Sequence, residues 1–60
     1  METIKEVLMR RDGITENEAD DLIADAKEEM YYRLEHGEDA YDICQEYFGL
    51  EPDYLIELLY

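Results

Sequence analysis

A capping box fixes where the longest helix of this 60-residue chain begins. In a box of this kind a Thr hydroxyl accepts a hydrogen bond from the amide three residues later, and a Glu at that later position reaches back to the amide of the Thr. Thr15 and Glu18 have this spacing, and apolar residues recur at helical intervals after them until Gly37. We therefore expect one helix from about residue 16 to residue 35 or 36.

The two sides of this expected helix differ in chemistry. With about 100° of rotation per residue, one side is an apolar stripe formed by Ala19, Leu22, Ile23, Ala26, Met30 and Leu34. The opposite side carries a row of acidic residues and one tyrosine, namely Asp21, Asp25, Glu28, Tyr32 and Glu35. Only Lys27 and Arg33 interrupt the acidity of the helix. The apolar stripe predicts that shorter elements pack against the long helix.

A short helix is expected before the long one. Thr3 and Glu6 form a second capping box, and Gly13 suits the left-handed position that follows a helix. The inward face of this helix is formed by Ile4, Val7 and Leu8, with Arg11 at its edge.

Two more short helices are expected in the second half of the chain. Asp39 is the predicted N-cap of a third helix that ends at Gly49 and turns inward Ala40, Ile43, Cys44, Tyr47 and Phe48. Pro52 is the predicted first residue of a last helix that carries Leu55, Ile56, Leu58 and Leu59. The pattern predicts an all-α fold, a compact small bundle of about four helices with a long second helix flanked by three short ones. We expect residues 1–60 to form a single acidic helical domain.

The net charge of the chain excludes several classes of ligand. Eighteen acidic residues against five basic ones give a formal charge of -13. We expect no direct binding to nucleic acid or to an anionic membrane, because affinity for both comes mostly from Lys and Arg. No run approaches the roughly 18 apolar residues of a membrane span, and the first residues lack the basic-then-apolar order of a signal peptide. Together with a single cysteine, these features favour a cytoplasmic protein.

Catalytic and metal-binding patterns are sparse in this sequence. His36 and Cys44 are the one candidate pair of base and nucleophile, and neither an orienting partner nor a glycine-rich loop accompanies them. The position of Cys44 favours a buried apolar role, and the position of His36 before Gly37 favours a helix-capping role. No stretch has the order of an EF-hand loop or the spacing of a zinc site. We expect a protein that is not an enzyme and needs neither a cofactor nor a metal.

Acidic residues are distributed unevenly along the chain. The net charge is +1 over residues 1–11, -6 over residues 12–33 and -8 over residues 34–60, where no Lys or Arg occurs. Like charges also stand four residues apart on the long helix, as at Asp21 and Asp25, and each such pair costs a few tenths of a kcal/mol. Acidity that lowers the stability of so small a domain favours a functional acidic face whose partner is a basic protein surface.

The acidic row has a spacing that suits one kind of partner. Carboxylates four residues apart on a helix stand about 6 Å apart along its axis, close to the spacing of phosphates along a nucleic acid strand. The row can therefore imitate a strand for a nucleic-acid-binding protein. Tyr32 lies within the row, and amphipathic rings beside charges are typical interface anchors. The predicted partner-binding residues are Asp21, Asp25, Glu28, Tyr32 and Glu35.

Four segments carry a resemblance to a known class of proteins. They are residues 1–11, DGITENEADDLI at 12–23, HGEDAYDIC at 36–44 and YFGLEPDYL at 47–55. In these segments the chain resembles small acidic proteins of bacteriophages and other mobile elements, among them DNA mimics and anti-CRISPR inhibitors. The resemblance implies a small helical fold and the inhibition of host nucleic-acid-binding machinery. It implies no particular functional residue.

Alternative interpretations stay open from the sequence. The chain can be a small adaptor or antitoxin-like subunit that docks through apolar helix faces, with its acidity serving only solubility. In that case Tyr54, Ile56, Leu59 and Tyr60 at the C-terminal helix would hold a partner or a second copy in a homodimer. An acid-rich composition can also be an adaptation to high salt. An enzyme is the most remote alternative, and it rests on His36 and Cys44 alone.

Overall fold

The computed structural model describes residues 2–59, and this part of the chain folds into four α-helices and one 3-10 turn with no strand. The elements are α1 (Ile4–Asp12), α2 (Glu16–Glu35), α3 (Ile43–Phe48), the 3-10 turn η1 (Pro52–Tyr54) and α4 (Leu55–Leu59). At 1.5 Å per residue α2 is about 30 Å long, so it sets the longest dimension of the molecule, 34 Å. The predicted all-α class and the predicted long second helix are both confirmed.

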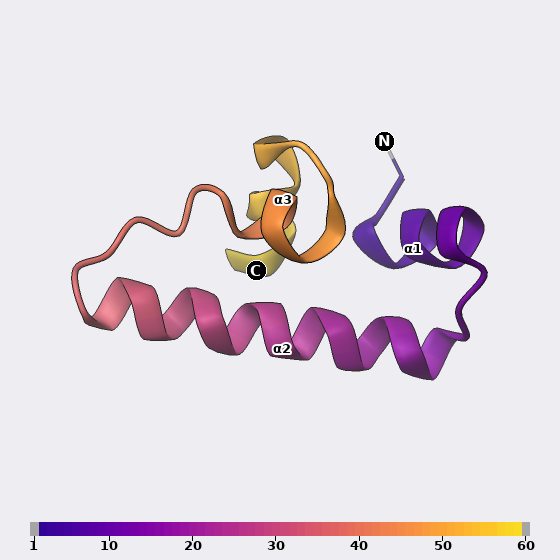
Figure 1. Ribbon diagram of the computed structural model, residues 1–60, viewed down its shortest axis with the longest axis horizontal. Helices are drawn as coiled ribbons and strands as arrows, with labels where there is room; N and C mark the ends of the chain where they lie inside the picture. Colours follow the sequence, from indigo (N-terminus) through magenta and orange to yellow (C-terminus); the bar gives the residue numbers. More distant parts are fainter. Residues whose placement is uncertain (1, 60) are drawn as a thin grey trace.

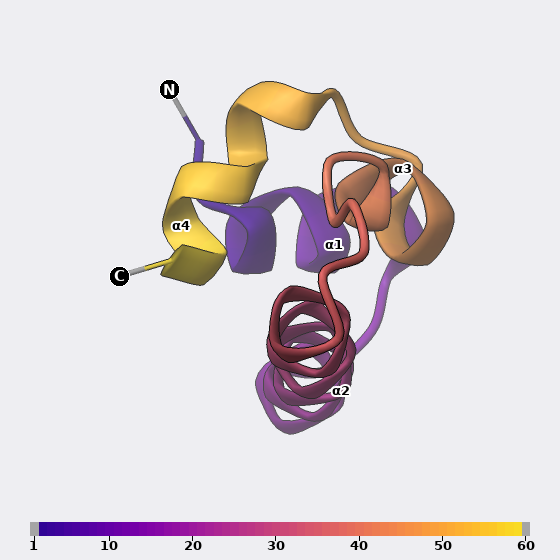
Figure 2. The same cartoon turned by 90° about the vertical axis from the view of Figure 1, so that its left-hand side faces the viewer.

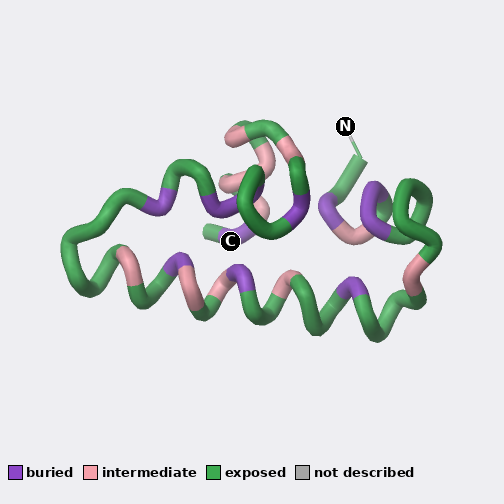
Figure 3. Tube along the Cα trace, viewed as in Figure 1, coloured by how far each residue is buried: buried purple, intermediate pink, exposed green. Residues whose placement is uncertain are grey.

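The short elements all lie on one side of α2. Figure 1 shows α1 beside the first half of α2, and α3 and α4 beside its middle. Figure 2, which looks along α2, shows these elements gathered on the same side of that helix. In Figure 3 the buried positions of α2 face this side and exposed positions cover the other. We call these the inner side and the outer face of α2.

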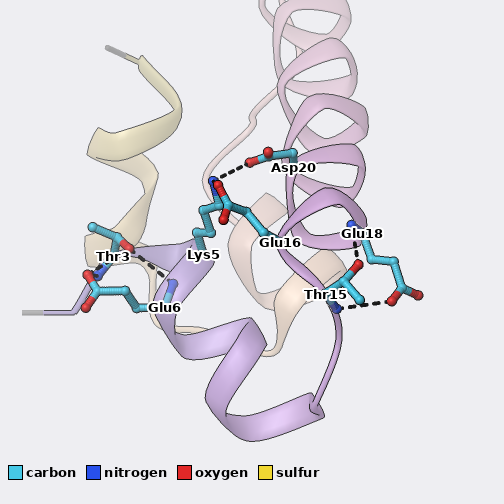
Figure 4. Close-up of polar contacts among 7 residues, drawn as sticks. All are labelled: Thr3, Lys5, Glu6, Thr15, Glu16, Glu18 and Asp20. Atoms are coloured by element: carbon cyan, nitrogen blue, oxygen red, sulfur yellow. Dashed lines mark hydrogen bonds and ion pairs between the residues drawn. The ribbon is translucent and has the colours of Figure 1, made fainter.

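Both predicted capping boxes form. The amide of Glu18 donates to Thr15 Oγ1 at 3.2 Å, and the amide of Thr15 donates to Glu18 Oε1 at 3.1 Å (Figure 4). Thr3 and Glu6 exchange the same two bonds, each at 3.1 Å, at the start of α1. Each box satisfies amides that have no partner within the first turn of its helix. The two helices therefore begin at the residues that the sequence predicts.

Glycines in the left-handed conformation end two of the helices. Gly13 follows α1 with φ 65° and Gly49 follows α3 with φ 66°. A Cβ atom is unfavourable at this φ, so glycine is the residue that lets the chain turn sharply there. The predicted ends of the first and third helices are confirmed.

A small core lies between α2 and the shorter helices. Its buried members are Ile4, Leu8, Ala19, Ala26, Met30, Ala40, Ile43, Cys44, Phe48 and Leu58. Ala19 and Ala26 are fully buried, and their short side chains let the other helices approach α2 closely. The accessible surface is 4140 Å², and a folded monomer of this mass is expected to expose about 4100 Å². The chain is thus as compact as a single folded domain of its size.

Four polar contacts join the helices around this core. Lys5 of α1 pairs with Glu16 and Asp20 at the start of α2, with Nζ to oxygen distances of 2.9 and 3.1 Å (Figure 4). Arg33 of α2 pairs with Glu46 of α3 at 2.8 Å. The amide of Ile4 donates to Glu57 Oε2 of α4 at 2.9 Å, so a carboxylate from the far end of the chain caps α1.

The third helix begins later than the sequence predicts. Asp39 is the predicted N-cap, but α3 begins at Ile43 with Asp42 at its N-cap position. Asp39 Oδ1 instead accepts from the amide of Tyr41 at 2.8 Å. An Asp side chain holds a turn of this kind as readily as it caps a helix, so the local sequence does not distinguish the two.

The apolar stripe of α2 is covered only in part. Ala19, Ala26 and Met30 are fully buried, whereas Leu22 is 38% exposed and Leu34 is 50% exposed. The prediction that these two leucines belong to the buried stripe is therefore wrong. The short helices α3 and α4 have 6 and 5 residues, too few to cover the flanks of a 20-residue helix along its whole length.

One more residue that the pattern predicts to face inward lies at the surface. Tyr47 is 38% exposed although it was placed on the inner face of its helix by the pattern. Arg11 is exposed and pairs with Asp12 at 2.9 Å. In the last element Pro52 begins a 3-10 turn, and α4 buries Leu58 but leaves Ile56 and Leu59 about half exposed. The predicted contact of Tyr60 lies outside the described residues.

Candidate functional site

The five predicted partner-binding residues lie on the outer face of α2. Asp21, Asp25, Glu28, Tyr32 and Glu35 are all exposed. They stand opposite the buried positions Ala19, Ala26 and Met30, because helical periodicity separates the two sets by about half a turn. The elements that pack on α2 lie on its inner side, and the outer face remains accessible along its length (Figure 2).

The outer-face carboxylates differ from their neighbours in pairing. Asp20 binds Lys5 at 3.1 Å and Glu29 binds Arg33 at 3.0 Å. Asp21 and Glu28, one residue away in each case, make no ion pair and no side-chain hydrogen bond within residues 2–59. The same is true there of Asp25 and Glu35. On α2 the face that was predicted to bind a partner is therefore the face whose charges are not neutralised within the fold.

Most basic side chains of the chain are engaged elsewhere. Their ion pairs join Lys5 to Glu16 and Asp20, Arg10 to Glu2, Arg11 to Asp12, and Arg33 to Glu29 and Glu46. Hydrogen bonds from Arg10 and Arg11 lower the pKa of Glu2 and that of Asp12, respectively. Lys27 is half-buried and makes no ion pair in the described part of the chain. The negative field of the outer face is thus left uncompensated.

Tyr32 adds an aromatic ring to the acidic face. Its side chain is 55% exposed, and its ring centroid lies 4.2 Å from that of His36, with 35° between the planes. Tyr32 lies in the last turn of α2, and His36 is the C-cap of that helix. The contact between the two rings restricts the orientation of the tyrosine ring. The predicted capping position of His36 is confirmed. A restrained, exposed tyrosine loses little conformational entropy when a partner covers it.

An open hollow lies where the edge of the outer face of α2 borders α3. It has a volume of about 450 Å³ and is lined by Asp25, Glu28, Glu29, Tyr32 and Tyr47. The structure therefore brings three of the five predicted residues to one place, whereas Asp21 and Glu35 lie outside this lining. Glu29 and Tyr47 were not predicted as site residues. The spacing of Glu29 and Arg33 could have indicated the first, but only the packing of α3 on α2 brings the second to this face.

His36 and Cys44, the residues of the enzyme hypothesis, lie in different environments. Cys44 is fully buried in the core, as its position in the sequence predicts, whereas the ring of His36 lies against exposed Tyr32. Burial raises the pKa of the Cys44 thiol, and the nearby Glu57 carboxylate raises it further. A thiol held in its protonated form is a poor nucleophile.

Two other features, a metal site and a membrane-spanning helix, are not found within residues 2–59. Among the described residues, no three His, Cys, Asp or Glu side chains come together in an arrangement that could hold a metal ion. Within the same residues, none of the helices has both the length and the apolarity needed to cross a membrane. Comparison with protein-family models, with curated proteins and with solved structures gives no match to this chain.

Proposed function

We propose that this protein is a non-enzymatic interaction protein that binds a basic, nucleic-acid-binding surface of a partner protein and competes there with nucleic acid. The outer face of α2 is the binding surface. Asp21, Asp25, Glu28 and Glu35 supply the charge, and Tyr32 supplies the apolar contact. This is the mode of action of a DNA mimic, and it extends to inhibitors of nucleic-acid-guided defence systems of the anti-CRISPR kind.

The observation that carries the proposal is the difference in pairing on α2. Carboxylates that face α1 or α3 are neutralised by Lys5 or Arg33, whereas the outer-face carboxylates have no partner within residues 2–59. An acidic face that served only solubility would gain stability from interspersed bases, which relieve repulsion at i,i+4. The chain instead keeps repelling charges on the side of α2 that none of the described elements packs against (Figure 2).

The dimensions of the face are compatible with this role. Asp21 and Glu35 are 14 residues apart, which corresponds to about 21 Å along the helix axis. Over this length carboxylates recur at one-turn intervals at Asp21, Asp25 and Glu28, and Tyr32 occupies the next turn. A partner groove that binds a nucleic acid strand would meet negative charges on α2 at intervals close to those of phosphates. The positive charge of the groove would therefore attract the outer face of α2 as it attracts nucleic acid.

The hollow beside this face suits an arginine of the partner. Arg forms two parallel hydrogen bonds with a carboxylate and stacks on aromatic rings, and both kinds of group line the hollow. Asp25 and Glu28 are the lining carboxylates that have no partner within residues 2–59, since Glu29 is bound to Arg33. Tyr32 and Tyr47 are the rings. Arginine is common on surfaces that grip phosphates, so this preference supports the same class of partner.

The test is capture of the partner followed by a comparison of two matched variants. The immobilised protein is incubated with a nuclease-treated lysate of the source cells, and bound proteins are eluted with duplex DNA or with salt. We expect a protein that binds nucleic acid and that duplex DNA displaces. With this partner purified, the double variant Asp21→Asn, Glu28→Gln should bind about five- to tenfold more weakly, because each exposed ion pair contributes up to about 1 kcal/mol.

The control is the double variant Asp20→Asn, Glu29→Gln, which removes the same charge from adjacent positions whose carboxylates are already paired. Its affinity should stay within about twofold of the parent protein. Equal losses in the two variants would show that only net charge matters. A partner whose affinity does not change between 50 and about 300 mM salt would contradict the electrostatic mechanism.

A further inference from the structure

A second surface, separate from the outer face, is apolar. A hollow of about 200 Å³ lies between the second half of α2, the connection that precedes α3, and α4. Its lining is formed by Met30, Leu34, Asp39, Ala40, Tyr41, Leu55 and Leu59. Leu34, Tyr41 and Leu59 are between 50% and 57% exposed, so their side chains form an accessible rim around a buried floor that includes Met30 and Ala40. We call this surface the apolar groove.

The size of the groove indicates what kind of group it accepts. Pockets for small organic ligands usually enclose about 300 to 1000 Å³, and this groove is smaller. It is adequate for one or two aliphatic side chains. Grooves between helices take such side chains from an amphipathic helix, whose anchors are spaced by three or four residues. Exposed apolar residues on a protein surface are usually scattered singly, whereas three of them lie together at this opening.

Charge distinguishes between the two helical occupants that are available, a second copy of this chain and a different protein. No Lys or Arg occurs in residues 34–60, which carry a net charge of -8. Asp39 is the charged residue of the lining, Arg33 is bound to Glu29 and Glu46, and Lys27 is two turns before Leu34 and outside the lining. In a two-fold dimer this acidic region would face its own copy, and like charges across an interface oppose association.

From this complementarity we infer that the apolar groove binds an amphipathic helix of a partner protein, one that inserts two neighbouring aliphatic side chains and carries Lys or Arg beside them. The aliphatic side chains fill the space between Leu34, Leu55 and Leu59, and the basic residues meet Asp39 in the lining and are attracted by the net negative charge of residues 34–60. This inference does not rest on the proposed function, because it uses other residues on the other side of α2. The two surfaces can be occupied independently.

The experiment uses three labelled synthetic peptides of equal length. The first has Leu at i, i+3, i+4 and i+7 of a helix with Lys at the polar positions, the second has the same composition in scrambled order, and the third has Glu in place of Lys. Fluorescence anisotropy with the intact protein should give at least tenfold tighter binding for the first peptide than for either of the others. Equal affinity for the ordered and scrambled Lys peptides would overturn the inference, because it would reduce binding to charge attraction alone.

Three serine variants test whether the first peptide binds in the apolar groove. Leu34→Ser and Leu59→Ser should each weaken the first peptide at least fivefold, whereas Ile56→Ser should leave its affinity within about twofold. Ile56 is a matched control because it is 54% exposed on the same helix as Leu59 but is absent from the lining. Circular dichroism checks that each variant is folded, which we expect because all three side chains are about half exposed. Similar losses in all three variants would contradict the assignment to the groove.

Two further measurements separate this inference from its alternatives. The variant Asp21→Asn, Glu28→Gln should bind the first peptide within about twofold of the parent protein, so the outer face and the groove are tested separately. Light scattering of the parent protein should report a monomer. A dimer that is lost in Leu34→Ser and Leu59→Ser would overturn the inference, since it would identify a second copy of the chain as the occupant.

Discussion

Two pairs of neighbouring residues on α2 show how position alone divides identical chemistry. Asp20 is bound by Lys5 of α1 at 3.1 Å, and Glu29 is bound by Arg33 of α2 itself at 3.0 Å. Asp21 and Glu28 are next to them in sequence but lie on the outer face, without an ion pair in residues 2–59. A rotation of about 100° per residue is sufficient to separate a structural carboxylate from one that remains available to a partner.

The same comparison applies to the apolar and aromatic residues of the helix. Met30 is fully buried on the inner side, whereas Tyr31 and Tyr32 are 52% and 55% exposed. The inner side therefore contributes to stability, and the outer face contributes to binding under the proposed function. Substitutions on the inner side should therefore change the free energy of unfolding, and substitutions on the outer face should change the affinity for a partner.

The largest effect is expected from the inner side. Met30→Ala removes a fully buried side chain from the core and should lower the free energy of unfolding by about 2 to 5 kcal/mol, enough to unfold much of so small a domain. Urea denaturation followed by circular dichroism measures it. Leu22→Ala is the control, because Leu22 belongs to the same predicted stripe but is 38% exposed, and it should cost less than half as much. Equal costs would mean that the two positions are equally covered.

The next largest effect is expected from the outer face. Tyr32→Ala should weaken binding to the captured partner by about tenfold or more, because an exposed tyrosine at the centre of an interface is a common hot spot. Tyr31→Ala is the matched control, since Tyr31 is equally exposed one residue away and lies outside the acidic row. It should change the affinity by less than about threefold. If both variants lost a comparable amount of affinity, the interface with the partner would have to extend beyond the outer face.

The start of α2 supports both sides of the helix equally. Thr15→Ala removes the acceptor for the Glu18 amide and should lower the free energy of unfolding by about 1 kcal/mol. Thr15→Ser is the control, because it keeps the hydroxyl and should recover most of the loss. Urea denaturation of both variants tests this, and a serine variant as unstable as the alanine variant would show that the methyl group, and not the hydrogen bond, stabilises the cap.

Removal of charge should change the free energy of unfolding in opposite directions for the unpaired and the paired carboxylates of α2, and by a smaller amount. Asp21→Asn, Glu28→Gln removes repelling charges and should raise the free energy of unfolding by a few tenths of a kcal/mol. Asp20→Asn, Glu29→Gln removes two ion-paired carboxylates and should lower it by a similar amount. Thermal unfolding at low ionic strength compares them, and added salt should reduce both effects. If the free energy of unfolding changed in the same direction in both double variants, the proposed difference in ion pairing between the two sets of carboxylates would be contradicted.

The smallest effect at neutral pH comes from Cys44, whose raised pKa acts only in alkaline solution. Above the ordinary thiol pKa of about 8.5 the unfolded chain loses this proton before the folded protein does, so the stability should fall as the pH rises through this range. At pH 7 both states keep the proton, and no effect is expected. In the variant Cys44→Ala the free energy of unfolding should fall less steeply with pH. The titration of Tyr and Lys contributes equally to the variant and to the parent protein. An unchanged slope would mean that the thiol is not protected.

Local sequence was sufficient for the helix boundaries that depend on a few neighbouring residues. The capping boxes at Thr3 and Thr15 and the left-handed glycines at Gly13 and Gly49 act within one helical turn, so their effect can be read from the chain. Asp39 shows the limit of this reasoning, because its side chain can cap a helix or hold a turn with the same hydrogen-bonding groups.

The outer face was predictable for a similar reason. Helical periodicity places Asp21, Asp25, Glu28, Tyr32 and Glu35 on one side of α2 whatever else the chain does. The pairing of Glu29 with Arg33 could be predicted from their spacing of four residues, but the pairing of Asp20 could not, because Lys5 reaches α2 from another helix. The same holds for Tyr47, which joins the hollow beside Tyr32 only through the position of α3.

The sequence by itself thus determined the all-α class, the starts of α1 and α2, and the acidic and apolar sides of α2, since these depend on intervals of three and four residues. Tertiary structure alone decided which parts of the apolar side are covered. Short helices packed on a long one bury Met30 but leave Leu34 and Leu59 at an open groove. Coverage depends on the lengths and positions of elements that are distant along the chain, and no local interval contains that information.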